Sequence, residues 1–239
     1  MSVVEVIVVA IAALLGGAAQ SMLGFGAAFT TVPVLAVVAP QLLPGAALVA
    51  FLPLAGLMAL RERRHVDRQS ALRLSVARIP GILSGAVAVK LLEPRGLAMV
   101  VAVIMLLAVG SVVAGWSFEP TPSAQRLAGA VSGFAGTSVG LGGPPLAVLY
   151  RDRPPAESRP TLAIVFASGI MMSLAALAVS GSFSRAQMSA GALISLAILS
   201  GMVMAAPLLR RVDDATIRRW LLAWAAAGSL LALLRVLFG

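Results

Sequence analysis

The chain has 239 residues, of which 60% are hydrophobic and 11% are charged, and its mean hydropathy is +1.01. Soluble domains are about 45–50% apolar and about 25% charged, so this composition excludes an ordinary water-soluble globule. The chain has no Cys and one His, which excludes disulfides, thiolate metal sites and a metal centre built from histidines. The net charge of +9 comes from arginines clustered between apolar segments, a pattern typical of membrane proteins. We therefore expect an all-α polytopic membrane protein with no metal and no cofactor.

Ten apolar segments follow one another along the chain. Eight are interpreted as membrane-spanning helices, for which about 17–25 residues are needed: 3–23, 42–60, 74–92, 96–115, 124–139, 161–180, 187–207 and 217–238. Two are shorter, 26–39 and 142–150. The first segment carries Glu5, has no basic stretch before it and exceeds the apolar part of a signal peptide, so we interpret it as a retained helix.

The 18 Lys and Arg residues are distributed unevenly among the connecting loops. If the loops around 61–73 and 210–219 both face the cytoplasm, counting crossings places thirteen basic residues inside: Arg61, Arg63, Arg64, Arg68, Arg73, Arg126, Arg151, Arg153, Arg159, Arg210, Arg211, Arg218 and Arg219. Four then lie outside: Lys90, Arg95, Arg185 and Arg235. Because cytoplasmic loops are enriched in basic residues, we expect this orientation in the cell inner (plasma) membrane, with both termini on the non-cytoplasmic side.

The short segment 142–150 is predicted to be half of a re-entrant hairpin. The same count places 116–123 and 151–159 on one side, so the chain between them must enter the membrane and return. A helix of this length reaches only about 14 Å, against a hydrocarbon core of about 30 Å. The turn before Gly142 is therefore expected inside the membrane, where irregular backbone must be buried in protein or line a wet cavity.

The two halves of the chain are related by an offset of 116 residues. The aligned positions are mostly glycine and proline: Gly17 with Gly133, Gly24 with Gly140, Gly26 with Gly142, Pro44 with Pro160, and Ile-Leu-Ser-Gly at 82–85 with 198–201. The equivalent loops around 61–73 and 185 are expected on opposite sides. The halves, 1–115 and 116–239, are therefore predicted to be inverted repeats of one membrane domain, each with a broken, re-entrant hairpin and about three transmembrane helices. This plan is typical of secondary transporters.

At these interruptions the chain resembles the sulfite exporter TauE/SafE family of membrane permeases. The resemblance is carried by Gly24-Phe25-Gly26, Pro33-Val34-Leu35, Gly133-Phe134-Ala135-Gly136 and Gly140-Leu141-Gly142-Gly143-Pro144-Pro145. It covers essentially the whole chain and implies a carrier of sulfite, sulfonates or other small organic anions across the cytoplasmic membrane. Ala27-Ala28 departs from the family's glycine-rich pattern, which allows the two turns to contribute unequally.

The candidate substrate site consists of the two interruptions and the polar residues beside them. Helices that restart after the interruptions direct free N–H groups and positive dipole ends into the turns, which suits an anion. The candidates are Gln20, Ser21, Gly24, Phe25, Gly26, Thr30, Thr31, Gly136, Thr137, Ser138, Gly140, Gly142, Gly143 and Pro144. Alternatively, these small and hydroxyl residues serve only close helix packing and hydrogen bonding between helices.

Arg78 completes the candidate set, because it is the one basic residue well inside a predicted span. An arginine at that depth usually faces a cavity or a partner, and its fork can bind an oxyanion through two hydrogen bonds. Alternatively, its side chain extends to the cytoplasmic interface. Carboxylates are scarce in the apolar segments, so a carboxylate proton relay lacks members. Sodium held by backbone carbonyls, anion exchange and a proton carried by the substrate remain open as coupling mechanisms.

Taken together, these features favour a secondary transporter for a small anion that works by alternating access. An anion channel on the same scaffold is the alternative. An intramembrane enzyme is not expected, since His65 lies in a charged loop and no acid or histidine converges on an arginine. The expected partners are the anion and the lipid bilayer, without nucleic acid, and a homodimer is the assembly considered.

Overall fold

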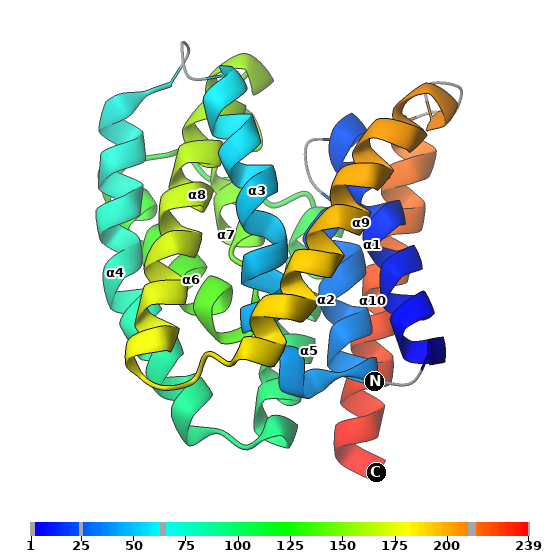
Figure 1. Cartoon of the computed structure of the whole chain (residues 1–239). Helices are drawn as coiled ribbons and strands as arrows, with labels where there is room; N and C mark the ends of the chain where they lie inside the picture. The colour runs from blue at the N-terminus through cyan, green and yellow to red at the C-terminus, as the bar shows by residue number, and fades with distance from the viewer. Residues whose placement is uncertain (1–2, 24–25, 63–65, 210–213, 239) are drawn as a thin grey trace.

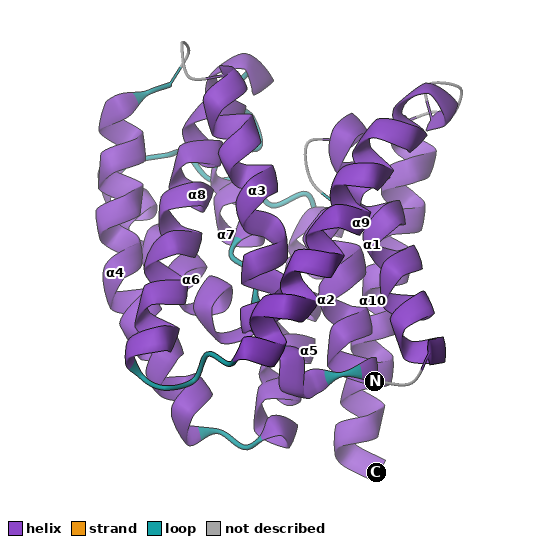
Figure 2. Cartoon of the chain, in the orientation of Figure 1, coloured by secondary structure: helices purple, strands orange, loops and turns teal. Residues whose placement is uncertain are grey.

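The computed structural model describes residues 3–23, 26–62, 66–209 and 214–238. These residues form ten α-helices and one 3₁₀-helix, with no strand in the described ranges (Figures 1 and 2). The helices are α1 (Val3–Leu23), α2 (Ala27–Val38), η1 (Pro40–Leu42), α3 (Gly45–Glu62), α4 (Arg68–Leu91), α5 (Pro94–Val113), α6 (Pro122–Val139), α7 (Gly143–Leu149), α8 (Pro155–Val179), α9 (Arg185–Leu209) and α10 (Asp214–Phe238). The predicted all-helical fold is confirmed for this part of the chain.

Each predicted apolar segment corresponds to one α-helix, but two predicted helix starts were wrong. Helices α4 and α8 begin at Arg68 and Pro155, each six residues earlier than expected. Proline is well suited to the first position of a helix, because its missing N–H would have no partner there. The basic residues predicted in the loops at 61–73 and 151–159 therefore lie partly on helix ends that continue beyond the apolar segments.

Asp67 explains the early start of α4. Its carboxylate accepts hydrogen bonds from the backbone N–H groups of Gln69 and Ser70, at 3.0 and 3.1 Å. Hydrogen bonds from Ser70 hold the pKa of Asp67 below its usual value, so the cap is charged at neutral pH. Such a cap satisfies N–H groups that have no partner within the helix.

Four helices are long and apolar enough, over their described residues, to cross a membrane. They are the segments Val3–Gln20, Arg68–Leu91, Glu157–Val179 and Arg185–Met204. Shorter apolar helices occur at Ala27–Val38, Gly45–Arg61 and Ala102–Ser111. Helix α6, predicted as a span, is rich in Gly, Ser and Ala, and the side chains of its C-terminal half are mostly buried against other helices. The result is a multi-pass membrane protein in which some helices are surrounded largely by protein.

Helices that are equivalent under the 116-residue offset make equivalent contacts. Helix α1 packs along α9, and its counterpart α6 packs along α4; α3 and α8, which are each other's counterparts, pack together. Glycines allow the close approach in both pairs, since a Cβ on Gly17 would overlap the carbonyl of Ile198, and one on Gly133 would overlap that of Arg78. Two of the aligned glycines therefore have a packing role.

The second hairpin, α6 and α7, enters from the end of the bundle where α4 and α8 begin, which we call the basic end. Here the backbone N–H of Asp67 donates to Thr161 Oγ1 at 3.0 Å, and Ser117 donates to the Asp152 carboxylate. Residues 116–123 and 151–159 thus lie on one side, as predicted.

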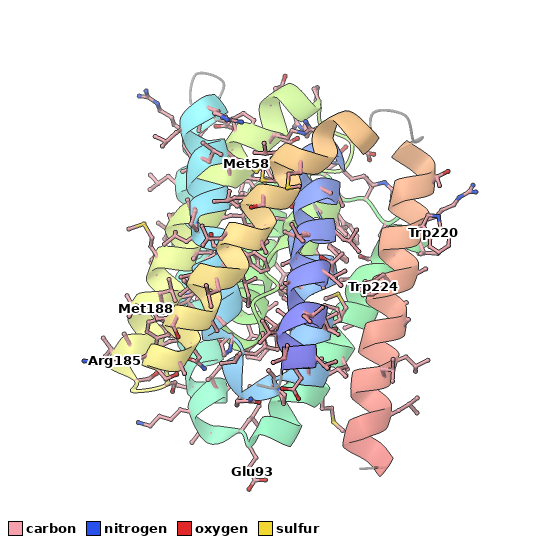
Figure 3. The ribbon with its side chains drawn as sticks, turned by 45° about the vertical axis from the view of Figure 1, so that its right-hand side comes forward. Met58, Glu93, Arg185, Met188, Trp220 and Trp224 are labelled. Carbon is pink, nitrogen blue, oxygen red and sulfur yellow. The ribbon has the colours of Figure 1, made fainter. Side chains whose placement is uncertain are left out.

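The first hairpin, α1 and α2, enters from the opposite end. Helix α1 begins and α10 ends there (Figure 1), and Gln187 at the start of α9 donates to the carbonyls of Gln41 and Leu43 beside η1. Glu93 and Arg185 also lie at this end, far from Met58 near the basic end (Figure 3). The two interrupted hairpins therefore enter the bundle from opposite directions.

Candidate functional site

The α6–α7 turn is buried in the protein. Helix α6 ends at Gly140, whose φ of 80° and ψ of 12° are left-handed and favour glycine. The N–H groups of Gly140 and Leu141 donate back to the carbonyls of Gly136 and Ala135, at 3.0 and 3.1 Å, which closes the helix end. The side chain of Leu141 is fully buried. The turn is thus an ordered irregular segment in the protein interior.

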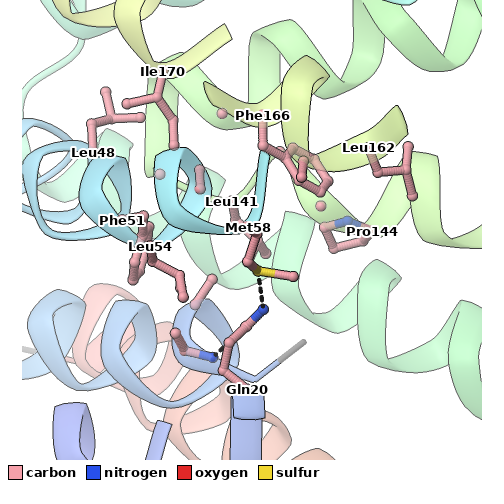
Figure 4. A pocket seen from close by; sticks show the side chains of 18 of the residues that line it. Gln20, Leu48, Phe51, Leu54, Met58, Leu141, Pro144, Leu162, Phe166 and Ile170 are labelled. Atoms are coloured by element: carbon pink, nitrogen blue, oxygen red, sulfur yellow. Dashed lines mark hydrogen bonds between the residues drawn. The ribbon is translucent and has the colours of Figure 1, made fainter. Parts of the chain in front are cut away.

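The α1–α2 interruption is built differently. Gly26 has a φ of 150°, which side chains rarely tolerate, and it is followed directly by α2. The side-chain oxygen of Gln20 accepts from the N–H of Ala27, the first residue of α2, at 3.3 Å, while the Gln20 amide group donates to the sulfur of Met58 (Figure 4). One helix N–H that could have met an anion is therefore bonded to a side chain.

A cavity of about 180 Å³ lies between these two interruptions. Its walls are mostly apolar: Phe51, Leu54 and Met58 from α3 and Leu162, Phe166 and Ile170 from α8 surround it, with Gln20 and Pro144 at its sides (Figure 4). This volume exceeds the space that one water needs, and it is below the roughly 300–1,000 Å³ of pockets for drug-sized ligands. The cavity suits a small solute.

The cavity reaches the basic end of the bundle. Arg159, which is exposed near the start of α8, belongs to its lining together with Met58. Toward the other end, the lining residues Leu48 and Leu141 are almost completely buried. The lining of the cavity thus includes an exposed side chain at the basic end and packed apolar side chains toward the start of α9.

Arg78 lies in the wall of this cavity and is only 2% exposed. Its Nη1 donates to Ser132 Oγ at 3.0 Å, and Ser132 in turn donates to the carbonyl of Gly142 in the α6–α7 turn. Its Cζ lies 5.8 Å from the centre of the Phe166 ring, within cation–π range. The guanidinium is thus held between α6, α8 and the turn, away from the bundle surface.

Three glycines make the space that the guanidinium occupies, which we call the glycine slot. A Cβ on Gly169 would lie 2.5 Å from Arg78 Cζ, and Cβ atoms on Gly136 and Gly142 would lie 3.1 and 3.2 Å from Nη2. Any side chain at these positions would therefore press on the guanidinium. Arg78 Nε is buried with no hydrogen-bond partner in the described structure, so the arginine retains unused donor capacity.

Eight of the fifteen candidate residues line the cavity. They are Gln20, Gly26, Arg78, Gly136, Gly140, Gly142, Gly143 and Pro144. Three lie outside the described residues or have undescribed side chains: Ser21, Gly24 and Phe25. Two of the remaining four are used within their own helices, because Thr30 Oγ1 donates to Ala27 O at 3.1 Å and Ser138 Oγ donates to Phe134 O at 2.7 Å.

The last two candidates also lie away from the cavity. Thr137 Oγ1 is bonded to Ser173 Oγ at 2.7 Å and joins α6 to α8. Thr31 is fully buried outside the cavity lining, and its hydroxyl has no partner in the described structure. The alternative interpretation, in which these hydroxyls serve hydrogen bonding between helices, accounts for Thr137. Nothing in the structure explains why the buried hydroxyl of Thr31 has no partner among the described residues.

Sequence reasoning missed Ser132, Phe166, Gly169 and Arg159. Ser132 and Gly169 contact Arg78 only because α6 and α8 pack on either side of α4, and local sequence patterns do not show that contact. Arg159 was counted only as a loop charge, although it lies within α8.

The arrangement is chemically suited to an anion. A buried guanidinium with free donor capacity beside a small cavity offers charge and directed hydrogen bonds in an apolar setting. The N-terminus of α7 offers fewer backbone N–H donors to an anion than predicted, because Pro144 and Pro145 have no N–H. Arg78, rather than the helix ends, is therefore the main anion-attracting group among the described cavity residues.

The fold defines a multi-pass membrane protein with interrupted helices around a small internal cavity. A family model described as sulfite exporter TauE/SafE matches residues 9–232, nearly the whole chain. The chain belongs to this family of membrane transporters, which confirms the resemblance found in its glycine-rich interruptions. No similar curated protein and no similar solved structure was found.

Proposed function

We propose that the chain is a secondary transporter that carries a small anion of the sulfite and organosulfonate class across the cytoplasmic membrane. The observation that carries this proposal is the buried Arg78 guanidinium in the cavity wall. Keeping an arginine at this depth is costly unless it has a partner, and the described cavity lining contains no carboxylate. A sulfite or sulfonate group presents several oxygens to which a guanidinium can donate two parallel hydrogen bonds.

The proposed anion site is asymmetric between the two halves, because Arg78 lies in the first half and Ser132 with the α6–α7 turn lies in the second. The position equivalent to Arg78 in the other half is Ile194, and the position equivalent to Ser132 is Gly16, beside the hydroxyl of Thr30. The guanidinium of Arg78 and the serine hydroxyl that accepts from it therefore have no equivalents at the matching positions of the other half. The anion lies against Arg78 and the α6–α7 turn, and Gln20 faces it from the first hairpin across the cavity.

Alternating access would use the two halves, 1–115 and 116–239, as inverted repeats. Hairpins that enter from opposite ends and equivalent helix pairs support this arrangement. If the basic end faces the cytoplasm, the orientation that the distribution of arginines favours, the cavity would open toward the cytoplasm and both termini would lie on the other side. Rocking of one half against the other would open the side now closed by Leu48 and Leu141.

The function is tested with the purified full chain in proteoliposomes. Uptake of labelled sulfite and of small sulfonates, above that of protein-free vesicles, is the expected result, together with competition among these anions. No uptake of any of them, in vesicles where the protein is shown to be folded, would overturn the proposal. Planar-bilayer recording tests the channel alternative, because unitary currents far above carrier turnover would require an open pore rather than a cavity closed at one end.

A further inference from the structure

A second cavity lies on the outer side of the α6–α7 hairpin. This outer groove, of about 660 Å³, runs between α5, α6 and α7 and is lined almost entirely by apolar side chains, among them Leu107, Leu127, Val131 and Val148. Leu107, Leu127 and Val131 are exposed, so the groove opens on the surface of the bundle. In a membrane protein, such a surface is in contact with lipid hydrocarbon.

A polar pocket of about 450 Å³ continues the groove at the basic end. The two cavities share Phe118, Glu119, Thr121 and Leu149 in their linings, so they adjoin. The polar pocket adds Asp152 and Arg153, which follow α7. Apolar space thus passes directly into a space lined by both acidic and basic groups.

The groove exists because the two halves differ in the second arm of their hairpins. Helix α2 has 12 residues and packs extensively against α10, whereas its counterpart α7 has seven residues and makes only a small contact with α5. The shorter helix leaves the faces of α5 and α6 without a neighbouring helix over part of their length. Trp116 and Phe118 are exposed at the rim, at the level where aromatic side chains meet lipid headgroups.

We propose that the outer groove and the polar pocket together bind one phospholipid of the phosphatidylethanolamine type. An acyl chain fills the groove, the phosphate meets Arg153, and the primary ammonium meets Glu119 and Asp152. The pocket carries both signs of charge, which matches a zwitterionic headgroup with N–H donors. A purely anionic headgroup would leave the carboxylates without a cation, and a choline headgroup has no N–H to donate to them.

This lipid would act on the transport cavity through α7. Pro144 belongs to the linings of both the outer groove and the central cavity, so α7 is the wall between them. The lipid site nevertheless stands on the groove and its charges, and it does not depend on the identity of the transported anion.

The test is lipid retention by the purified full chain, measured by native mass spectrometry after exchange into vesicles of phosphatidylethanolamine, phosphatidylcholine or phosphatidylglycerol. We expect one retained phosphatidylethanolamine and at least tenfold weaker retention of the other two lipids. Val131→Trp fills the groove and should reduce retention at least tenfold. Val87→Trp is the matched control, because Val87 is a similarly exposed valine on α4 outside the groove.

Headgroup variants separate the two charges. Glu119→Gln combined with Asp152→Asn should bring phosphatidylethanolamine and phosphatidylcholine retention to within twofold of each other, whereas Arg153→Gln should weaken both. Equal retention by Val131→Trp and the wild type, or no headgroup preference in the wild type, would overturn the proposal. The rival occupant of the groove is a second copy of the chain. Because the chain has no Cys, Leu127→Cys introduces a single thiol in the groove. Efficient formation of disulfide-linked dimers of this variant in vesicles would also overturn the lipid assignment.

Discussion

Replacing Gly169 with alanine tests the role of the glycine slot without removing any charge. The added Cβ would lie 2.5 Å from both Cζ and Nε of Arg78, and the three nearest atoms all belong to the guanidinium. Carbon contacts are comfortable at about 3.5 Å, so the guanidinium must move by about 1 Å. Alanine is a better helix former than glycine by about 1 kcal/mol, so α8 itself should remain intact.

The expected loss of affinity follows from that displacement. At an effective dielectric constant of about 20, an anion attracted by about 4 kcal/mol at 4 Å is attracted by about 3.3 kcal/mol at 5 Å, which weakens binding roughly fourfold. If the move also breaks the bond from Arg78 to Ser132, a further loss of about 1.5 kcal/mol brings the total to roughly fiftyfold. We therefore expect Gly169→Ala to weaken anion binding between about fourfold and fiftyfold.

The assay is the concentration dependence of anion uptake in proteoliposomes, supported by substrate-dependent thermal stabilisation of the purified protein. Gly143→Ala is the matched control, because Gly143 also lines the cavity, while a Cβ there would meet no atom within 4 Å. Wild-type affinity in Gly169→Ala, or an equal loss in both variants, would show that the position of the Arg78 guanidinium does not determine binding.

Three further variants examine the same site. Arg78→Ala should impair uptake far more than Arg73→Ala, because Arg73 is only half-buried and bonds to Gln125 near the basic end; equal effects in the uptake assay would make Arg78 a topological charge. Gly142→Leu should abolish uptake while membrane insertion, measured by fractionation, stays normal, since its Cβ would lie 2.9 Å from Ser132 O; wild-type flux would remove the turn from the site. Ser132→Ala should raise the KM about fivefold or more by leaving Arg78 Nη1 without an acceptor, and an unchanged KM would contradict this role.

Helix positions and the second interruption were predictable from the sequence because they depend on local chemistry. Apolar length defines the helices, and a run such as Gly140-Leu141-Gly142-Gly143-Pro144 cannot continue a regular helix, so the break had to occur there. The starts of α4 and α8 were misplaced because hydropathy shows where the apolar segment begins, whereas a cap such as Asp67 decides where the helix begins.

The site was only partly predictable because hydroxyl groups have local alternatives. Thr30 and Ser138 were candidates on account of their place beside the interruptions, yet each donates to a carbonyl of its own helix, as Ser and Thr often do. The surroundings of Arg78 depend on residues far apart in the chain, Ser132 and Gly169, and no local pattern indicates their contact. The sequence showed that Arg78 is unusual, but it did not show which groups hold it.

The charge balance of the cavity bears on how transport would be coupled. The described lining contains Arg78 and Arg159 and no carboxylate, so a proton relay through acidic side chains has no members there. The cavity lining is therefore electropositive, and a bound anion would bring the cavity closer to neutrality. Closing a low-dielectric passage around an uncompensated arginine costs more than closing it around an arginine paired with an anion. Under the proposed alternating access, the protein with its anion bound should thus change conformation more readily than the protein without it, and this difference would favour coupled anion exchange.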